Sequence, residues 1–147
     1  MEKPVRVNAA PVLTLWASVV AERLGHPPDT ALSLASAVAG TAARARPGGG
    51  QGIMLLGRQV PTTRLPDGTI LAVDAAGAPA PAEPIRAYLA RAFGPRLGEV
   101  RAAMEDRAAR HEPDDLNRVA LALFESFRPV APTDGTLRGA LHLDRIR

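Results

Sequence analysis

The sequence predicts an α+β fold that is mostly helical, with about five helices and one β-hairpin in a single domain covering residues 1–147. Apolar residues make up 46% of the chain but aromatic residues only 3%. Alanine supplies much of this apolar share, and it favours closely packed helices. Several segments also space their apolar residues three or four positions apart, as amphipathic helices do. A chain of 147 residues has the length of one ordinary domain.

The first helix is predicted to begin after Asn8 and to run to about Leu24, following an extended segment at residues 4–7. Asn8 is a good N-cap residue, and Pro11 lies in the first turn, where its missing N–H costs nothing. Apolar residues lie on more than one face, which indicates a central helix. Gly25 is suited to end it.

The second helix is predicted at about Thr30 to Arg44, because His26, Pro27 and Pro28 prevent the first helix from continuing. Asp29 or Thr30 can cap its start. Its apolar residues form one stripe at helical spacing, namely Ala31, Leu34, Ala35, Val38 and Ala42.

Residues 53–73 change character and predict a β-hairpin. Residues 53–60 and 69–73 read as strands, and Pro66-Asp67-Gly68 between them is a turn. Pro61 makes the first strand an edge or a bulge. Residues 1–74 would then be a helix-turn-helix followed by a hairpin, and the Pro/Ala-rich residues 75–84 a linker.

The C-terminal part, residues 85–128, is predicted to be helical. Helices are expected at residues 83–93, 96–110 and 113–127, with Gly94-Pro95 breaking the first from the second. Pro113 suits the first position of the last helix. Residues 129–147 are expected to be an irregular tail, within which residues 141–143 form a short strand or begin a final turn.

Residues 19–38 have the shape of a helix-turn-helix. Gly25 occupies the turn, with the small Ala21 four positions before it. A recognition helix presents Arg, Lys, Asn or Gln to base edges, and residues 30–43 contain none of these. The polar groups there are Thr30, Ser33, Ser36 and Thr41. We therefore expect this helix pair to be mainly a packing unit, with weak DNA contact as the alternative.

Positive charge concentrates just beyond the second helix. The net charge is only +3, and no acidic residue falls between Asp29 and Asp67. Four arginines fall in that interval: Arg44, Arg46, Arg58 and Arg64. A helix pair followed by a basic hairpin is the plan of winged-helix-like DNA binders. We predict a small nucleic-acid-associated protein whose four arginines contact DNA phosphates. The alternative is an ordinary charged loop and hairpin.

Two other classes of function remain open. One is a non-enzymatic helical interaction or assembly module, forming a homodimer through its Ala-rich helices. The other is an enzyme using Glu105, Asp106, His111 and Asp115. The alternative for these residues is a purely structural role in helix capping and ion pairing. We expect no enzyme activity, no cofactor and no metal, because the sequence shows no catalytic, cofactor or metal-binding motif. The Gly-rich residues 48–52, for example, lack the Gly-Lys-Ser/Thr ending of a phosphate loop.

The location is predicted to be cytoplasmic. The chain has no cysteine, which excludes disulfides and thiolate zinc sites. The apolar run at residues 9–21 is too short to span a bilayer, so no membrane partner is expected. The sequence does not identify a small-molecule ligand.

Several stretches resemble a family of small bacterial proteins with no established activity. They are residues 8–16 and 22–25 near the start, then Phe93-Gly94 and residues 100–104, 124–129 and 139–146. A Trp-Gly motif of that family is missing from the C-terminal part of this chain. The resemblance implies a bacterial origin and one continuous domain, and it assigns no site residues.

Overall fold

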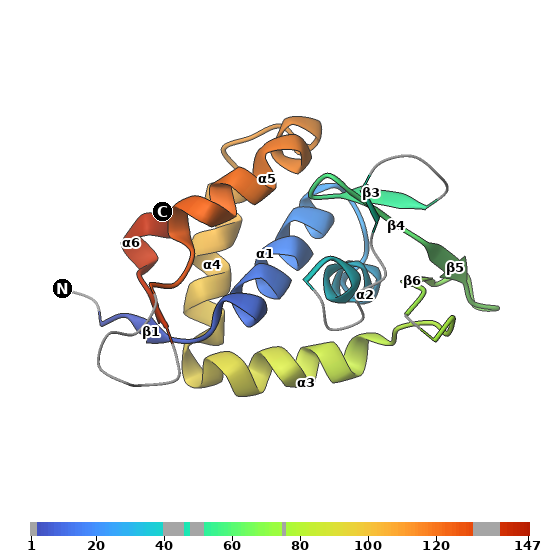
Figure 1. Ribbon diagram of the computed structural model, residues 1–147, viewed down its shortest axis with the longest axis horizontal. Helices are drawn as coiled ribbons and strands as arrows, with labels where there is room; N and C mark the ends of the chain where they lie inside the picture. Colours follow the sequence, from blue (N-terminus) through green and yellow to red (C-terminus); the bar gives the residue numbers. More distant parts are fainter. Residues whose placement is uncertain (1–2, 40–45, 48–51, 75, 131–138) are drawn as a thin grey trace.

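The computed structural model describes residues 3–39, 46–47, 52–74, 76–130 and 139–147, and it confirms a mostly helical α+β fold. Figure 1 shows short antiparallel strand pairs at the two ends of a helical body. The helices are α1 (Ala9–Arg23), α2 (Pro28–Ala39), α3 (Ala82–Phe93), α4 (Leu97–Ala108), α5 (Pro113–Phe127) and the single turn α6 (Leu143–Ile146). The strands are β1 (Val5–Arg6), β2 (Arg46–Pro47), β3 (Ile53–Leu55), β4 (Arg58–Val60), β5 (Thr62–Arg64), β6 (Ile70–Ala72) and β7 (Ala140–Leu141).

Helix α1 is the centre of the core, as predicted from apolar residues on more than one of its faces. All but one of residues 11–21 are buried, and Figure 1 shows α1 crossing the middle of the molecule. Trp16 is fully buried, its indole N–H donates to the Ala120 carbonyl at 2.9 Å, and its ring meets Phe127 edge-on. Asn8 occupies the N-cap position, although its side chain makes no capping hydrogen bond.

The turn between α1 and α2 contains the predicted glycine, but the cap prediction for α2 is wrong. Gly25 has φ +106°, and its amide donates to the Glu22 carbonyl. This left-handed conformation ends the helix and favours glycine. Helix α2 begins at Pro28, where proline is pre-set for the first helical position. Asp29 and Thr30 therefore lie inside the first turn and do not cap it. The predicted residues 40–44 lie outside the described part.

Two hairpins stand where one was predicted. Strand β3 pairs with β4 across Leu56-Gly57, and β5 pairs with β6 across the predicted Pro66-Asp67-Gly68 turn. Leu56 and Gly57 both have positive φ, as a tight two-residue hairpin turn requires. Pro61 lies between β4 and β5 and belongs to neither strand. Its missing N–H therefore removes no hydrogen bond from the pairing of β4. Strand β2 adds to the other edge of β4.

The C-terminal residues pack back on the start of the chain. Strand β7 pairs antiparallel with β1, with Val5 opposite Leu141, and α6 follows it. The tail predicted to be irregular thus holds both a short strand and a final turn, and residues 131–138 lie outside the described part. Helix α3 begins at Ala82, inside the predicted linker, and the Ala80 amide donates to the Ala72 carbonyl. None of the described helices is long and apolar enough to cross a membrane.

Candidate nucleic-acid interface

The hydroxyl groups of α2 face inward. Residues 30–37 are all buried, with exposed fractions of 3% for Thr30 and 0% for Ser33 and Ser36. The predicted stripe residues Ala31, Leu34 and Ala35 are buried, and burial also extends to the other faces of the helix over residues 30–37. Thr41 lies outside the described part. The described α2 hydroxyls are consequently inaccessible to a base edge, which agrees with the expectation of a packing unit.

Two of these hydroxyls hold the β5–β6 hairpin. One edge of β6 pairs with β5, which leaves backbone groups on the other edge. Thr30 Oγ1 donates to the Ile70 carbonyl at 2.7 Å. Ser33 Oγ accepts from the Ala72 amide at 2.8 Å and donates to the Ala80 carbonyl at 2.6 Å. Since buried backbone groups need partners, these side chains complete the free edge of the sheet.

The β3–β4 hairpin is held in the same way by α5. The Asn117 side-chain amide donates to the Met54 carbonyl at 2.9 Å, and its carbonyl accepts from the Leu56 amide at 2.8 Å. This two-point contact fixes the backbone of the tight turn, where Leu56 is buried despite its positive φ. This role of Asn117 is not predictable from the sequence, because a single Asn on an amphipathic helix carries no specific signal.

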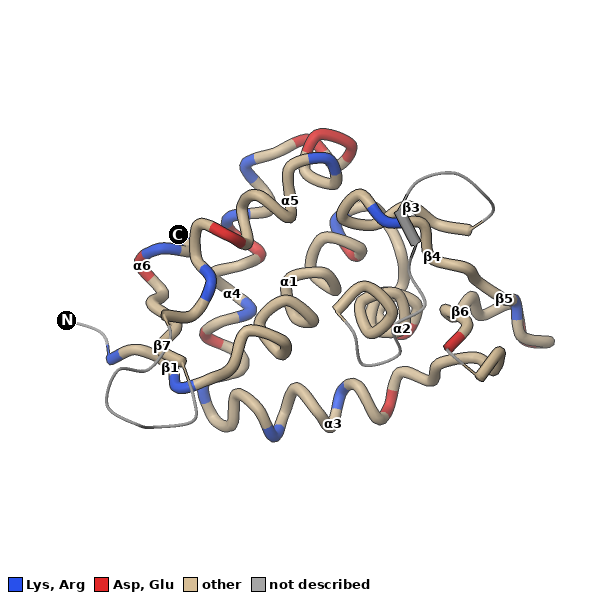
Figure 2. The backbone as a smooth tube through the Cα atoms, in the orientation of Figure 1, with Lys and Arg blue, Asp and Glu red and all other residues tan. Residues whose placement is uncertain are grey.

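Arg58 and Arg64 are the two predicted phosphate contacts whose side chains the structure describes. Arg58 lies on β4 opposite Leu55 of β3, and Arg64 lies on β5 opposite Ile70 of β6. Both side chains are exposed. Within the described part of the chain, neither makes an ion pair or a side-chain hydrogen bond. Figure 2 shows the hairpins together at one end of the molecule.

The other two predicted contacts are less fully described. Arg44 lies outside the described residues. Arg46 belongs to β2, where it is in register with Gln59 of β4, while its neighbour Pro47 is in register with Arg58. The structure thus brings the backbone of Arg46 into the sheet that carries Arg58, and it places Arg64 in the next hairpin.

The two hairpins differ in their acidic surroundings. No acidic residue occurs in residues 46–60. The β5–β6 turn contains Asp67, whose pKa is lowered chiefly by the hydrogen bond that its carboxylate accepts from the Thr69 backbone N–H. This carboxylate stays ionised, so the β5–β6 hairpin carries a negative charge as well as the positive charge of Arg64. Asp115, at the start of α5, is paired with Arg118 at 2.9 Å.

Many arginines of the helical body already have partners. Arg86 of α3 contacts Asp29 of α2, and Arg101 of α4 contacts Glu22 of α1. Others bind backbone carbonyls, as Arg23 does with the His111 carbonyl at 2.9 Å. A guanidinium carries five donors in a rigid fork, which suits it to such links between segments. The high arginine content of the chain therefore serves packing as well as surface charge.

The candidate acid–base residues do not form a site. Glu105 lies 3.6 Å from Arg101, Asp115 pairs with Arg118, and the backbone of His111 holds Arg23. Among the described residues, no three His, Asp or Glu side chains are placed to hold a metal ion. Glu105 and Asp115 thus lie in ion pairs, as the structural interpretation predicts, whereas the N-cap residue of α5 makes no side-chain capping hydrogen bond.

A hollow of ≈ 510 Å³ separates the α1–α2 turn from the β5–β6 turn. His26, Asp29, Asp67 and Thr69 are among the residues that line it. Partial burial lowers the pKa of His26, so its imidazole is neutral near pH 7. The carboxylates of Asp29 and Asp67 beside it would repel a phosphate, so this hollow is unsuited to phosphate binding.

A comparison with protein-family models, curated proteins and solved structures finds no match for this chain. The resemblance to a family of small bacterial proteins therefore stays a prediction, and a function has to be argued from the residues described above.

Proposed function

We propose that the protein binds nucleic-acid phosphates through its two hairpins and does not read the base sequence. The observation that supports this most is the exposure of Arg58 and Arg64 without any partner among the described residues, next to a helix whose hydroxyls are buried. Arginine on a phosphate supplies affinity without sequence information. The absence of cysteine suits a reducing compartment, so we place this activity in the cytoplasm.

The side chains available at the hairpins favour backbone contacts over base contacts. Residues 46–73 contain no aromatic residue, so the hairpins offer no platform on which a base can stack. Met54 and Gln59 stand opposite each other on β3 and β4, and Gln59 is half-buried. The expected ligand is therefore a duplex or other polyanion that presents a regular row of phosphates.

Binding to a labelled duplex of about 20 base pairs, measured by fluorescence anisotropy at about 50 and 200 mM salt, tests this proposal. For two to four phosphate contacts, affinity should fall roughly 10- to 150-fold across this range. Two duplexes of unrelated sequence should bind equally. A protein that fails to bind at low salt, or that strongly prefers one sequence, contradicts the proposal.

A matched pair of variants locates the contacts. Arg58→Gln/Arg64→Gln removes two charges from the hairpins, and Arg110→Gln/Arg145→Gln removes two exposed arginines from elsewhere. Only the hairpin variant should bind substantially more weakly. If both variants lose the same affinity, the attraction comes from net charge, and the hairpins are not a binding surface.

The second candidate is an assembly module, and one observation favours it. Two exposed large apolar side chains, Met54 (41% exposed) and Leu121 (40% exposed), flank the Asn117 contact between β3 and α5. Most alanines of α1 and α2 are buried within the chain, namely Ala17, Ala21, Ala31, Ala35 and Ala37, so a partner would meet this junction instead. Light scattering over a range of protein concentrations should then show a dimer that Met54→Ser/Leu121→Ser converts to a monomer. A wild-type monomer at every concentration excludes this candidate.

A further inference from the structure

A second hollow, of ≈ 390 Å³, lies between the start of α1 and the C-terminal half of α3. This volume is in the range of small-ligand sites. Figure 1 shows that this part of α3 lies toward the end of the molecule that carries both termini, away from the hairpins. Apolar and polar side chains both line the hollow, among them Val7, Asn8, Pro11, Tyr88, Arg91 and Ala92.

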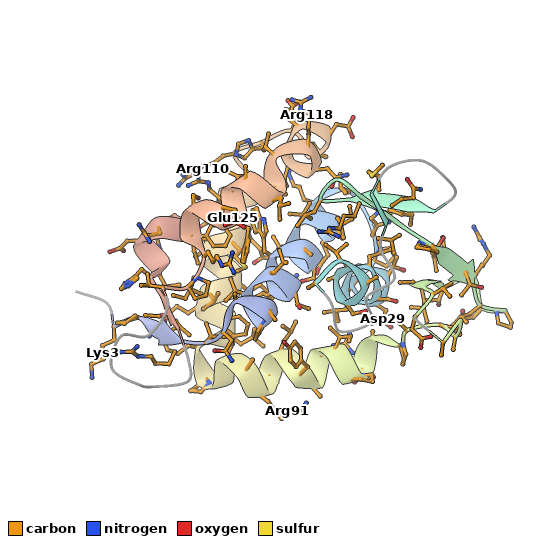
Figure 3. The ribbon with its side chains drawn as sticks, viewed as in Figure 1. Lys3, Asp29, Arg91, Arg110, Arg118 and Glu125 are labelled. Atoms are coloured by element: carbon orange, nitrogen blue, oxygen red, sulfur yellow. The ribbon has the colours of Figure 1, made fainter. Side chains whose placement is uncertain are left out.

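Three polar side chains of this hollow have no partner within the described part of the chain. Asn8 makes no capping hydrogen bond. Arg91, labelled in Figure 3, is exposed and forms no ion pair. Tyr88 is half-buried, and burial raises the pKa of its hydroxyl, which therefore remains a neutral donor. In contrast, Arg86 and Arg96, one turn or more away along the chain, are both paired with carboxylates.

The charge of the hollow is positive. Arg91 is the charged residue among those that line it, and no described carboxylate lines it. A guanidinium matches the geometry of a carboxylate or phosphate, and the Tyr88 hydroxyl and Asn8 amide add neutral donors. The apolar walls formed by Val7, Pro11 and Ala92 suit a ring or a short chain.

We infer that this hollow binds a small organic anion, with an apolar ring or chain against Val7, Pro11 and Ala92 and one anionic group held by Arg91, Tyr88 and Asn8. This site is separate from the hairpins and does not depend on nucleic-acid binding.

Protein-observed NMR with three ring compounds of matched size tests the inference. Benzoate and phenyl phosphate carry the anionic group, and benzylamine carries a cation on the same ring. Both anions should shift the backbone amides of Asn8, Ala10 and Ala92 in a saturable way, and benzylamine should not. The absence of any shift with the anions, or equal shifts with benzylamine, overturns the inference.

Three variants test the roles of the side chains. Arg91→Gln should weaken binding of the better anion at least about tenfold, because it removes a charge-assisted hydrogen bond. Tyr88→Phe should weaken it about threefold or more by removing one neutral hydrogen bond. Arg110→Gln is the control, since Figure 3 shows Arg110 on the opposite side of the molecule from Arg91. If Arg91→Gln and Arg110→Gln weaken binding equally, the anion is attracted by net charge and the site does not exist.

Discussion

A DNA-binding recognition helix combines a position in a helix-turn-helix with accessible basic side chains. In this protein, helix α2 has the first property and the two hairpins have the second. Helix α2 has the position in a helix-turn-helix pattern, but residues 30–37 are buried. The hairpins have no such pattern, yet they carry Arg58 and Arg64, which are exposed and have no ion-pair or hydrogen-bond partner among the described residues. The lesson is that a turn motif predicts the course of the backbone, whereas burial decides which side chains a partner can reach.

The same comparison separates two uses of polar side chains. The inward-facing Thr30 and Ser33 complete the backbone hydrogen bonding of β6, so they should determine stability. The exposed Arg58 and Arg64 form no ion pair or side-chain hydrogen bond with the described residues, so they should determine binding. Substitutions of the buried α2 hydroxyls should therefore lower stability, and substitutions of the hairpin arginines should lower binding affinity. The experiments below test this separation.

The largest expected effect is that of Leu34→Ala in α2. Leu34 has no exposed surface, and truncating a buried leucine costs about 2–5 kcal/mol of unfolding free energy. Leu121→Ala, at a helix position that is 40% exposed, is the matched control and should cost far less. Urea denaturation measures both. Equal costs would mean that α2 is not the buried helix described here.

Ser33→Ala should come next, at about 1–3 kcal/mol, because it leaves the Ala72 amide and the Ala80 carbonyl without their partner. Ser126→Ala is the control, since the exposed Ser126 hydroxyl bonds only to the Leu123 carbonyl one turn back. Thermal unfolding compares the two. A Ser33→Ala protein as stable as the control would show that β6 does not depend on α2.

Asn117→Ala should loosen the other hairpin, with a cost of about 1–2 kcal/mol for two hydrogen bonds. Hydrogen exchange of the Leu56 amide should quicken more than exchange of the Ala72 amide, which Ser33 holds. Uniform quickening at both amides would indicate that Asn117 acts on global stability and not on the β3–β4 hairpin.

Acidification should have a smaller effect. Burial lowers the pKa of His26 in the folded state, so the unfolded chain binds more protons as the pH falls below the ordinary histidine value. His26 makes no pH-dependent contribution to stability above about pH 6.5, and it destabilises the folded state as the pH falls below that value. Unfolding at pH 7.5 and 5.5 should show less pH dependence in His26→Gln than in the wild type, and an unchanged pH dependence would exclude His26 as a source.

The sequence predicted helix positions well where strong local signals exist. The helix at residues 113–127 was predicted with its observed bounds, because Pro113 starts it and a long apolar seam continues to Phe127. The central position of α1 followed from its apolar residues. The single hairpin was wrong because the pattern at residues 53–60 hides a turn: Leu56 is apolar, and nothing local shows that it adopts a positive φ.

The site was harder to predict than the fold. The sequence of α2 does indicate burial, since its only polar residues after Asp29 are the small hydroxyl residues Thr30, Ser33 and Ser36. The partners of those hydroxyls lie some 40 residues away in the chain, at Ile70 and Ala72. Charge counts pointed to Arg58 and Arg64, but their lack of partners among the described residues depends on where the carboxylates lie in three dimensions.

The salt dependence of duplex binding tests the central claim most directly. Log affinity is plotted against log salt for the wild type and for Arg58→Gln/Arg64→Gln, after confirming that the two proteins differ in stability by less than about 0.5 kcal/mol. Each lost phosphate contact lowers the steepness of this line by about one. If Arg58 and Arg64 each contact a phosphate, the line for the variant should be less steep by about two, whereas parallel lines for the wild type and the variant would show that neither arginine contacts the duplex.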